Sequence, residues 1–209
     1  MELNAKLVEY IKDKVLPVYE KNDKAHRLDH IDYVIGRSME FAKGVKDIDL
    51  DMVYTVACYH DIAHHIDAKR HEELSAKYLL EDETLKQFFS SDKITIMAEA
   101  IEDHRASMKS ESRSVYGKIV SSADRNTDLL TPLIRTYEFR KQKSSDMTDL
   151  EIMEESRLHL IDKFGSKGYA KNKMFFNDPA YEKFLKELEV LTLDKDKFKE
   201  AFFRANHLD

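Results

Sequence analysis

An apolar segment that ends in metal-capable side chains constrains the fold more than any other feature of this chain. Residues 51–63 are mostly apolar, which predicts a helix buried on all sides. The segment ends in His60-Asp61, and His64 and His65 follow directly. A buried carboxylate is costly unless it is paired or bound to a metal ion. Other parts of the chain must therefore supply partners at the end of this core helix.

Apolar residues recur at helical spacing along most of the remaining chain. The spacing predicts helices over residues 2–20, about 31–42, 71–81, from Asp92 to about 104, and from 115 to 130 with Asp124 in its middle. Two more are expected before Phe164, and two begin at Asp178-Pro179 and Asp194. Only 5 glycines and 3 prolines occur in 209 residues, which is too few turn residues for a sandwich or an α/β fold. We therefore predict an all-α fold, a single helical domain over residues 1–209.

Charge and cysteine content limit the partners and the compartment. The formal net charge of −6 argues against a surface for a nucleic-acid polymer or an anionic membrane. No stretch approaches the ~20 apolar residues of a membrane span, and the N-terminus lacks the apolar core of a signal peptide. The single Cys58 cannot form an internal disulfide, which favours a reducing compartment. We expect a cytoplasmic protein with a small-molecule partner, and a homodimer is among the states left open.

Six histidines and aspartates recur at the ends or inner faces of successive predicted helices. They are His30, His60, Asp61, His71, His104 and Asp124. A helical bundle can converge such side chains on one point. Neutral imidazoles and carboxylates together suit Mn, Fe, Zn, Co or Ni, and Mg where oxygen donors are added. Taken singly, each residue has a simpler explanation, such as a core histidine at His104 or an ion pair of Asp124 with Arg125.

The order of these residues resembles a known superfamily. His30, then His60-Asp61, then Asp124 on successive helices is similar to the HD-domain superfamily of metal-dependent phosphohydrolases. The segments "HEELSAKYLLED", "AIEDHRAS" and "GKIVSSADRNTDL" resemble the branch that carries two extra histidines. The resemblance covers about residues 20–130. It implies an HD-type helical bundle over that core, with additional C-terminal helices over about 131–209.

The resemblance also implies a ligand set. His30, His60, Asp61 and Asp124 would hold a first metal ion. In two-metal members the acid of the HD pair bridges, so Asp61, His71 and His104 would hold a second. In one-metal members, histidines at these places contact the phosphate or protonate the leaving group. The sequence leaves both alternatives open, as it does the identity of the metal.

Further residues are candidates for catalysis and substrate binding. Asp61 or Asp124 could orient a water molecule or take its proton. Many relatives follow the HD pair with an acid or a lysine, whereas this chain has His64 and His65, which could serve as a ligand, a general acid or a phosphate contact. Either could replace His71 as a ligand. Phosphate contacts are expected from cations near the ligands, namely Arg105, Lys118, Arg27, Arg70 and Arg125.

The implied function is a metal-dependent phosphohydrolase. Its substrate would be a small phosphorylated metabolite, preferably a nucleotide, cleaved at a phosphomonoester or pyrophosphate bond. The loop from Gly165 to Lys173 could close on that substrate through its lysines. Two other functions remain: a di-iron oxygenase on the same ligands, and a non-catalytic HD module that binds a nucleotide. The second would be expected to lack a ligand, and none of the six is missing.

Overall fold

The fold is helical throughout the part of the chain that the structure describes. The computed structural model describes residues 2–23, 26, 28–108, 110–144, 146–170 and 174–208. These residues form helices, turns and loops, with no strand among them, which confirms the predicted all-α fold. The chain divides into two compact units, Met1–Asp124 and Arg125–Asp209. The sequence places the start of the C-terminal extension at about residue 131, close to the boundary between the units.

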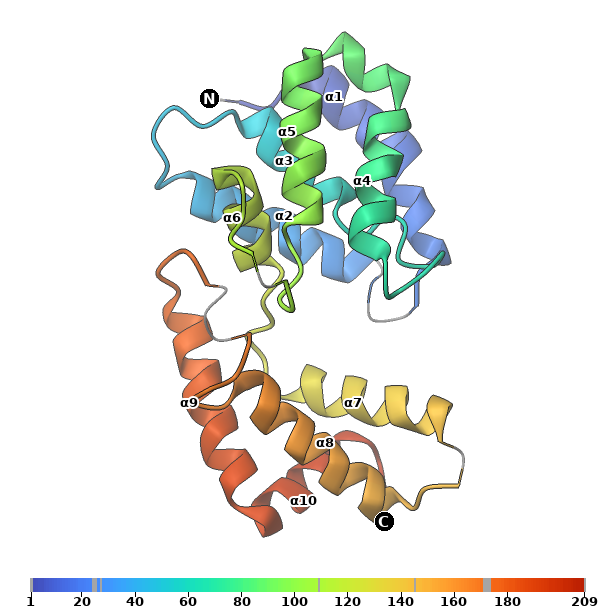
Figure 1. Cartoon of the computed structure of the whole chain (residues 1–209), viewed down its shortest axis with the longest axis vertical. Coiled ribbons are helices and arrows are strands. Elements are labelled where there is room, and N and C mark those ends of the chain that lie inside the picture. Colours follow the sequence, from blue (N-terminus) through green and yellow to red (C-terminus); the bar gives the residue numbers. More distant parts are fainter. Residues whose placement is uncertain are drawn as a thin grey trace. The chain divides into compact units, whose positions relative to one another are not determined.

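The first unit is a bundle built around one buried helix. Its α-helices are α1 (Ala5–Tyr10), α2 (Leu28–Ala42), α3 (Leu50–Tyr59), α4 (His71–Glu81), α5 (Ser91–Glu102) and α6 (Val115–Ala123). A π-helical turn (Ile11–Val15) and a 3₁₀ turn (Leu16–Lys21) continue α1. Within the unit, α4 packs beside α5, and α2 packs against α3 and α6 (Figure 1).

Helix α3 crosses the core of this unit, as its sequence predicts. Every residue from Met52 to Tyr59 is buried. The N-cap of the helix is Asp49, whose side chain accepts hydrogen bonds from the backbone N–H groups of Asp51 and Met52. It ends at Tyr59, earlier than the predicted residue 63. The chain then tightens into successive turns, so His60 and Asp61 lie just beyond the helix and not within it.

The turn that carries His60 and Asp61 is held in place by the N-terminal segment. The Tyr19 hydroxyl donates to the Cys58 carbonyl (2.9 Å) and accepts from the Asp61 N–H (3.3 Å). The buried Asn22 side chain donates to the Asp61 carbonyl (3.0 Å) and accepts from the His65 N–H (2.9 Å). The backbone on both sides of Asp61 is therefore fixed by side chains that lie some forty residues earlier.

Three further expected helix boundaries are wrong, and each concerns a helix end. Asp124 lies at the C-terminal cap of α6 instead of in the middle of a helix. His104 lies beyond the last residue of α5. Ser90, not Asp92, takes the extended backbone of the N-cap of α5, because Ser91 and Asp92 are already helical. At a helix end a side chain can turn toward neighbouring helices, which periodicity along the sequence does not reveal.

The described residues of the second unit form four helices, and the start signals of the last two match the sequence. They are α7 (Leu130–Lys143), α8 (Asp149–Phe164), α9 (Pro179–Leu193) and α10 (Lys195–Ala205). Asp178 and Asp194 cap α9 and α10 through backbone N–H groups of the first turns, as predicted. Of the proposed Gly165–Lys173 loop, residues 165–170 form turns, and Lys171 and Lys173 lie outside the described residues.

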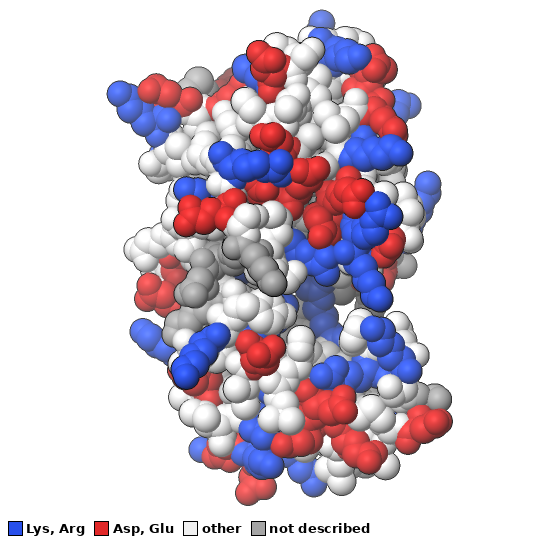
Figure 2. Space-filling view, in the orientation of Figure 1, with Lys and Arg blue, Asp and Glu red and all other residues white. Residues whose placement is uncertain are grey.

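The surface is highly charged. Acidic and basic side chains are interspersed across the face shown in Figure 2. Among the described helices, none combines the length and apolar character needed to cross a bilayer.

Replacing Tyr19 with Phe tests how this turn is held. The substitution leaves a buried carbonyl and a buried N–H without their partner, which should lower the free energy of unfolding by about 1–3 kcal/mol. Urea unfolding of the chelator-treated protein measures this change. The Tyr78→Phe variant is the control, because the Tyr78 side chain is 37% exposed. Equal stability of the two variants would contradict the role given to Tyr19.

Candidate metal centre

The six metal-ligand candidates converge within the first unit, although they come from five different segments. His30 is on α2, His60 and Asp61 follow α3, His71 begins α4, His104 follows α5, and Asp124 caps α6. Their donor atoms form two groups, each with all donors within 4.8 Å of one another. We call His30, His60 and Asp124 the first group, and Asp61, His71 and His104 the second group.

The carboxylate of Asp61 lies between the two groups. Its Oδ1 atom is 3.2 Å from His71 Nε2 and 3.4 Å from His104 Nε2. Its Oδ2 atom is 3.7 Å from His30 Nε2 and 3.6 Å from His60 Nε2. One oxygen of this buried side chain thus faces each group.

The distances within the groups suit donors that share an ion. Metal–nitrogen and metal–oxygen bonds of about 2.0–2.2 Å place two donors of the same ion roughly 3–3.5 Å apart. His71 Nε2 and His104 Nε2 are 3.2 Å apart. His30 Nε2 and Asp124 Oδ1 are 3.3 Å apart. Both spacings lie in this range.

Backbone carbonyls fix the orientation of three of the imidazoles. In each, Nδ1 is bonded to the carbonyl three residues earlier: His60 to Ala57 (2.8 Å), His71 to Ala68 (3.0 Å) and His104 to Ile101 (2.6 Å). A carbonyl can only accept, so the proton of the neutral ring lies on Nδ1. Each Nε2 therefore directs a lone pair at Asp61 and its neighbours, which is the tautomer that a metal ligand needs.

The positions of these nitrogen and oxygen atoms fit a cation bound between them better than they fit hydrogen bonds from one side chain to another. The lone pairs of His71 Nε2 and His104 Nε2 face each other at 3.2 Å and repel unless a proton or a cation lies between them. His30 Nε2, His60 Nε2 and Asp61 Oδ1 are buried and have no hydrogen-bond partner within the described part of the chain. Buried polar atoms without partners are rare and costly. Divalent transition metals accept this mixture of imidazole and carboxylate donors.

The charge states of His60 and Asp61 favour metal binding, whereas that of His30 opposes it. Burial lowers the pKa of His60 to about 4, so its ring is neutral at pH 7. Burial opposes ionisation of Asp61, but the surrounding histidines, beginning with His60, hold its pKa well below the usual range. Burial also lowers the pKa of His30, yet the carboxylates of Asp124 and Asp61 outweigh it and raise that pKa to about 9. An arriving cation therefore competes with a proton at His30.

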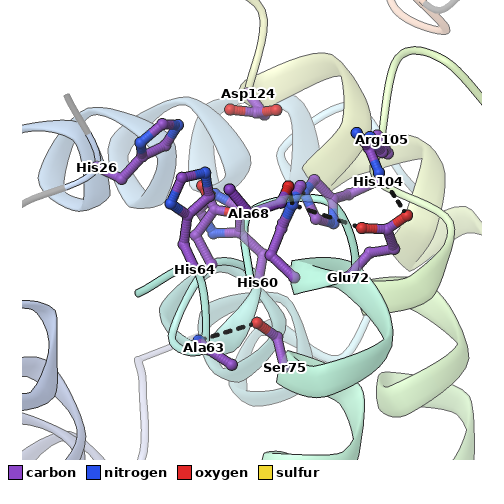
Figure 3. Close-up of polar contacts among 12 residues, drawn as sticks. His26, His60, Ala63, His64, Ala68, Glu72, Ser75, His104, Arg105 and Asp124 are labelled. Atoms are coloured by element: carbon purple, nitrogen blue, oxygen red, sulfur yellow. Dashed lines mark hydrogen bonds and ion pairs between the residues drawn. The ribbon is translucent and has the colours of Figure 1, made fainter. Parts of the chain in front are cut away.

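A salt bridge joins two of the three segments that carry the second group. Arg105 Nη1 donates to the Lys69 carbonyl (2.6 Å) and to Glu72 Oε1 (2.9 Å), as Figure 3 shows for Glu72. The other oxygen of Glu72 lies 3.4 Å from His71 Nδ1. This bridge links the start of α4, and so His71, to the chain just after His104. The phosphate contact expected of Arg105 stays a prediction.

Glu72 was not among the residues expected from the sequence. It directly follows His71 in "RHEEL", and an acid beside a candidate ligand was the available signal. Its partner lies 33 residues away in the sequence, however, so local pattern could not identify it.

The other candidates lie in different surroundings. The exposed His65 contacts Asn22 Oδ1 through its ring (3.1 Å), and His64 lies beside His71 with ring centroids 5.1 Å apart. Arg70 forms a surface ion pair with Glu73 (2.7 Å). Lys118 is half-buried on α6, and Arg125 belongs to the second unit. Arg27 lies outside the described residues.

Comparison with known proteins identifies the family. Residues 27–127 match the family model of the HD domain. Residues 27–127 therefore carry an HD domain, which confirms the resemblance seen in the sequence.

Comparisons with individual proteins add two findings. Among solved structures, a predicted HD superfamily hydrolase from an uncultured Thermotogales bacterium is similar with a TM-score of 0.47 and 20% sequence identity. The similarity covers 75% of this chain and 86% of that one. No curated protein matches the chain.

The Arg105–Glu72 bridge predicts a selective defect in metal binding. Arg105→Met should weaken metal binding at the second group by about 10–100-fold, the usual effect of losing a partner that orients a ligand. Binding at the first group should stay within about twofold. Titration against a competing chelator measures both affinities.

Arg70→Met is the matched control, because it removes a surface ion pair one residue before His71. If both variants weaken binding equally, the bridge has no specific role in positioning His71.

Proposed function

We propose that this protein is a metal-dependent phosphohydrolase with two divalent ions, acting on a small phosphorylated metabolite. The observation that carries the proposal is the position of Asp61, with one carboxylate oxygen directed at each of two donor groups. His30, His60 and Asp124 would hold one ion, His71 and His104 the other, and Asp61 would contact both. Two-metal sites of this kind are widely used for phosphoester hydrolysis.

The ligand residues differ in exposure, and this difference supports a direction for substrate entry. The side chains of His60, Asp61 and His104 are between 0% and 4% exposed. Those of His30 and Asp124 are 15% and 21% exposed. A phosphate group would therefore approach from the side of His30 and Asp124. The buried side of the centre excludes water from the remaining ligands.

The chain's own residues have separate tasks in the proposed reaction. Bound divalent ions supply a water of lowered pKa and polarise the phosphoryl oxygen. Asp124, the more exposed carboxylate, is placed to accept the proton of an attacking water. Asp61 is buried and directed at both donor groups, so its task is to hold and orient. The backbone-fixed histidines keep their Nε2 lone pairs directed inward throughout.

The substrate class is the finer part of this proposal. A nucleotide or another small phosphate ester is our preferred substrate, cleaved at a phosphomonoester or pyrophosphate bond. The net charge of −6 supports a small ligand over a nucleic-acid polymer, because a long polyanion would be repelled. We place the enzyme in the cytoplasm, in keeping with its single cysteine.

Phosphate release is the direct test. Protein loaded with Mn, Fe, Co, Ni, Zn or Mg should release phosphate from one or more members of a panel of nucleotides and sugar phosphates. Asp61→Asn should lower kcat by at least ~10²-fold, since metal-based stabilisation of the transition state is worth several kcal/mol. Asp29→Asn, an exposed acid beside His30 on α2, is the control and should retain activity.

Two results would contradict the proposal. Asp61→Asn could retain full activity with its metal bound, which would remove Asp61 from the reaction. Alternatively, iron-loaded protein could consume dioxygen with an organic substrate and release no phosphate, which would identify the di-iron oxygenase instead.

A further inference from the structure

We propose that Asp23, His26 and His64 form a third binding site for a divalent cation, next to the two donor groups described above. This inference concerns metal binding and does not depend on the phosphohydrolase activity. The three residues come from two segments: Asp23 and His26 precede α2, and His64 lies in the turn after α3.

The donor atoms of this cluster have spacings that suit one ion. His26 Nδ1 is hydrogen-bonded to Asp23, 2.8 and 3.0 Å from its two oxygens, and an ion would replace this contact. His64 Nδ1 lies 3.4 Å from Asp23 Oδ2. All three donors fall within 4.8 Å of one another, the same criterion that the first and second groups meet. Donors of one transition-metal ion stand roughly 3–3.5 Å apart for bonds of about 2.0–2.2 Å.

A buried amide holds the two segments of the cluster together. Asn22 is 2% exposed, and its Nδ2 donates to the His26 carbonyl (3.1 Å) and to the Asp61 carbonyl (3.0 Å). Asn22 therefore ties the loop of Asp23 and His26 to the turn that carries Asp61 and His64. The cluster is thus positioned by the interior of the unit, although Asp23 itself is 54% exposed.

The two rings must adjust to bind the same ion. In the structure they stack, with centroids 3.7 Å apart and planes at 23° (Figure 3). An imidazole binds a metal in the plane of its ring, so one ring has to turn about its Cβ–Cγ bond. The His26 and His64 side chains are 18% and 11% exposed, so neither ring is fully enclosed by its neighbours.

The donor set and the location indicate which cation would bind and where its charge would act. Two imidazoles and one carboxylate with remaining open positions suit Zn²⁺, and also Co²⁺ or Ni²⁺. The His64 ring is 5.1 Å from the ring of His71, and the His26 ring is 5.8 Å from that of His30, measured between centroids. A cation bound here would add positive charge beside the first group and the second group. Its site would be open to solvent on the side of Asp23.

Zinc stoichiometry tests the site. The full-length protein is stripped with a chelator and dialysed against Zn²⁺, and bound metal is measured by elemental analysis. Asp23→Asn, His26→Ala and His64→Ala should each bind one ion fewer than the wild type. His159→Ala, which removes a histidine from α8 in the second unit, should bind the wild-type number. Circular dichroism checks that each variant keeps its helices.

The Asp61→Ala variant separates this site from the proposed two-ion centre. It should lose ions from the centre and keep the ion that the three cluster variants lose. If only the cluster-dependent ion binds to the wild type, the third site stands and the two-ion centre fails. Equal zinc content in the wild type and the cluster variants would overturn the third site, and so would loss of every ion in Asp61→Ala.

Discussion

The burial of the Asp61 carboxylate is the constraint on which the rest of the first unit depends. An ionised carboxylate in a protein interior is strongly unfavourable unless its charge is met by partners. Here four imidazole nitrogens surround it, from His30, His60, His71 and His104. Three of those rings are fixed by backbone carbonyls in the tautomer that leaves a lone pair, and not a proton, facing inward. The carboxylate and these three rings therefore need a cation between them to be stabilised together, and the proton on His30 is the positive charge that the protein itself supplies there.

The architecture serves to deliver these side chains to one place. Helix α3 is apolar on all faces because it crosses the core, and its end brings His60 and Asp61 into the interior. The ends of the helices around it supply the other candidate ligands. Tyr19, Asn22 and the Arg105–Glu72 bridge then fix the positions of the turns, because no helical hydrogen bonds hold residues beyond a helix end.

The sequence predicts the helices and the candidate ligands from signals that lie within short segments of the chain. Apolar spacing locates the buried α3 segment, and side-chain caps such as Asp178 and Asp194 locate helix starts. The order of His30, His60-Asp61 and Asp124 identifies the HD domain. Helix ends are less predictable, because a residue just beyond a helix and a residue inside it differ little in pattern. The apolar spacing from Val115 to Leu130 therefore predicts Asp124 within a helix, whereas it lies at the C-terminal cap position of α6.

The supporting residues could not be predicted, because their roles arise from contacts between distant segments. Glu72 accepts a hydrogen bond from Arg105, which lies 33 residues later in the sequence. Asn22 donates a hydrogen bond to the carbonyl of Asp61, which lies 39 residues later in the sequence. Asp23 and His26 occupy a polar stretch that is typical of an ordinary loop. Nothing in the spacing of these residues distinguishes them from solvated side chains until the chain has folded.

Anomalous diffraction from crystals of the Mn²⁺-loaded protein tests the central claim most directly. Our account predicts two anomalous peaks about 3.5–4 Å apart, each bonded to a different oxygen of Asp61. A single peak bonded to both oxygens of Asp61, or peaks that leave Asp61 uncoordinated, would contradict it.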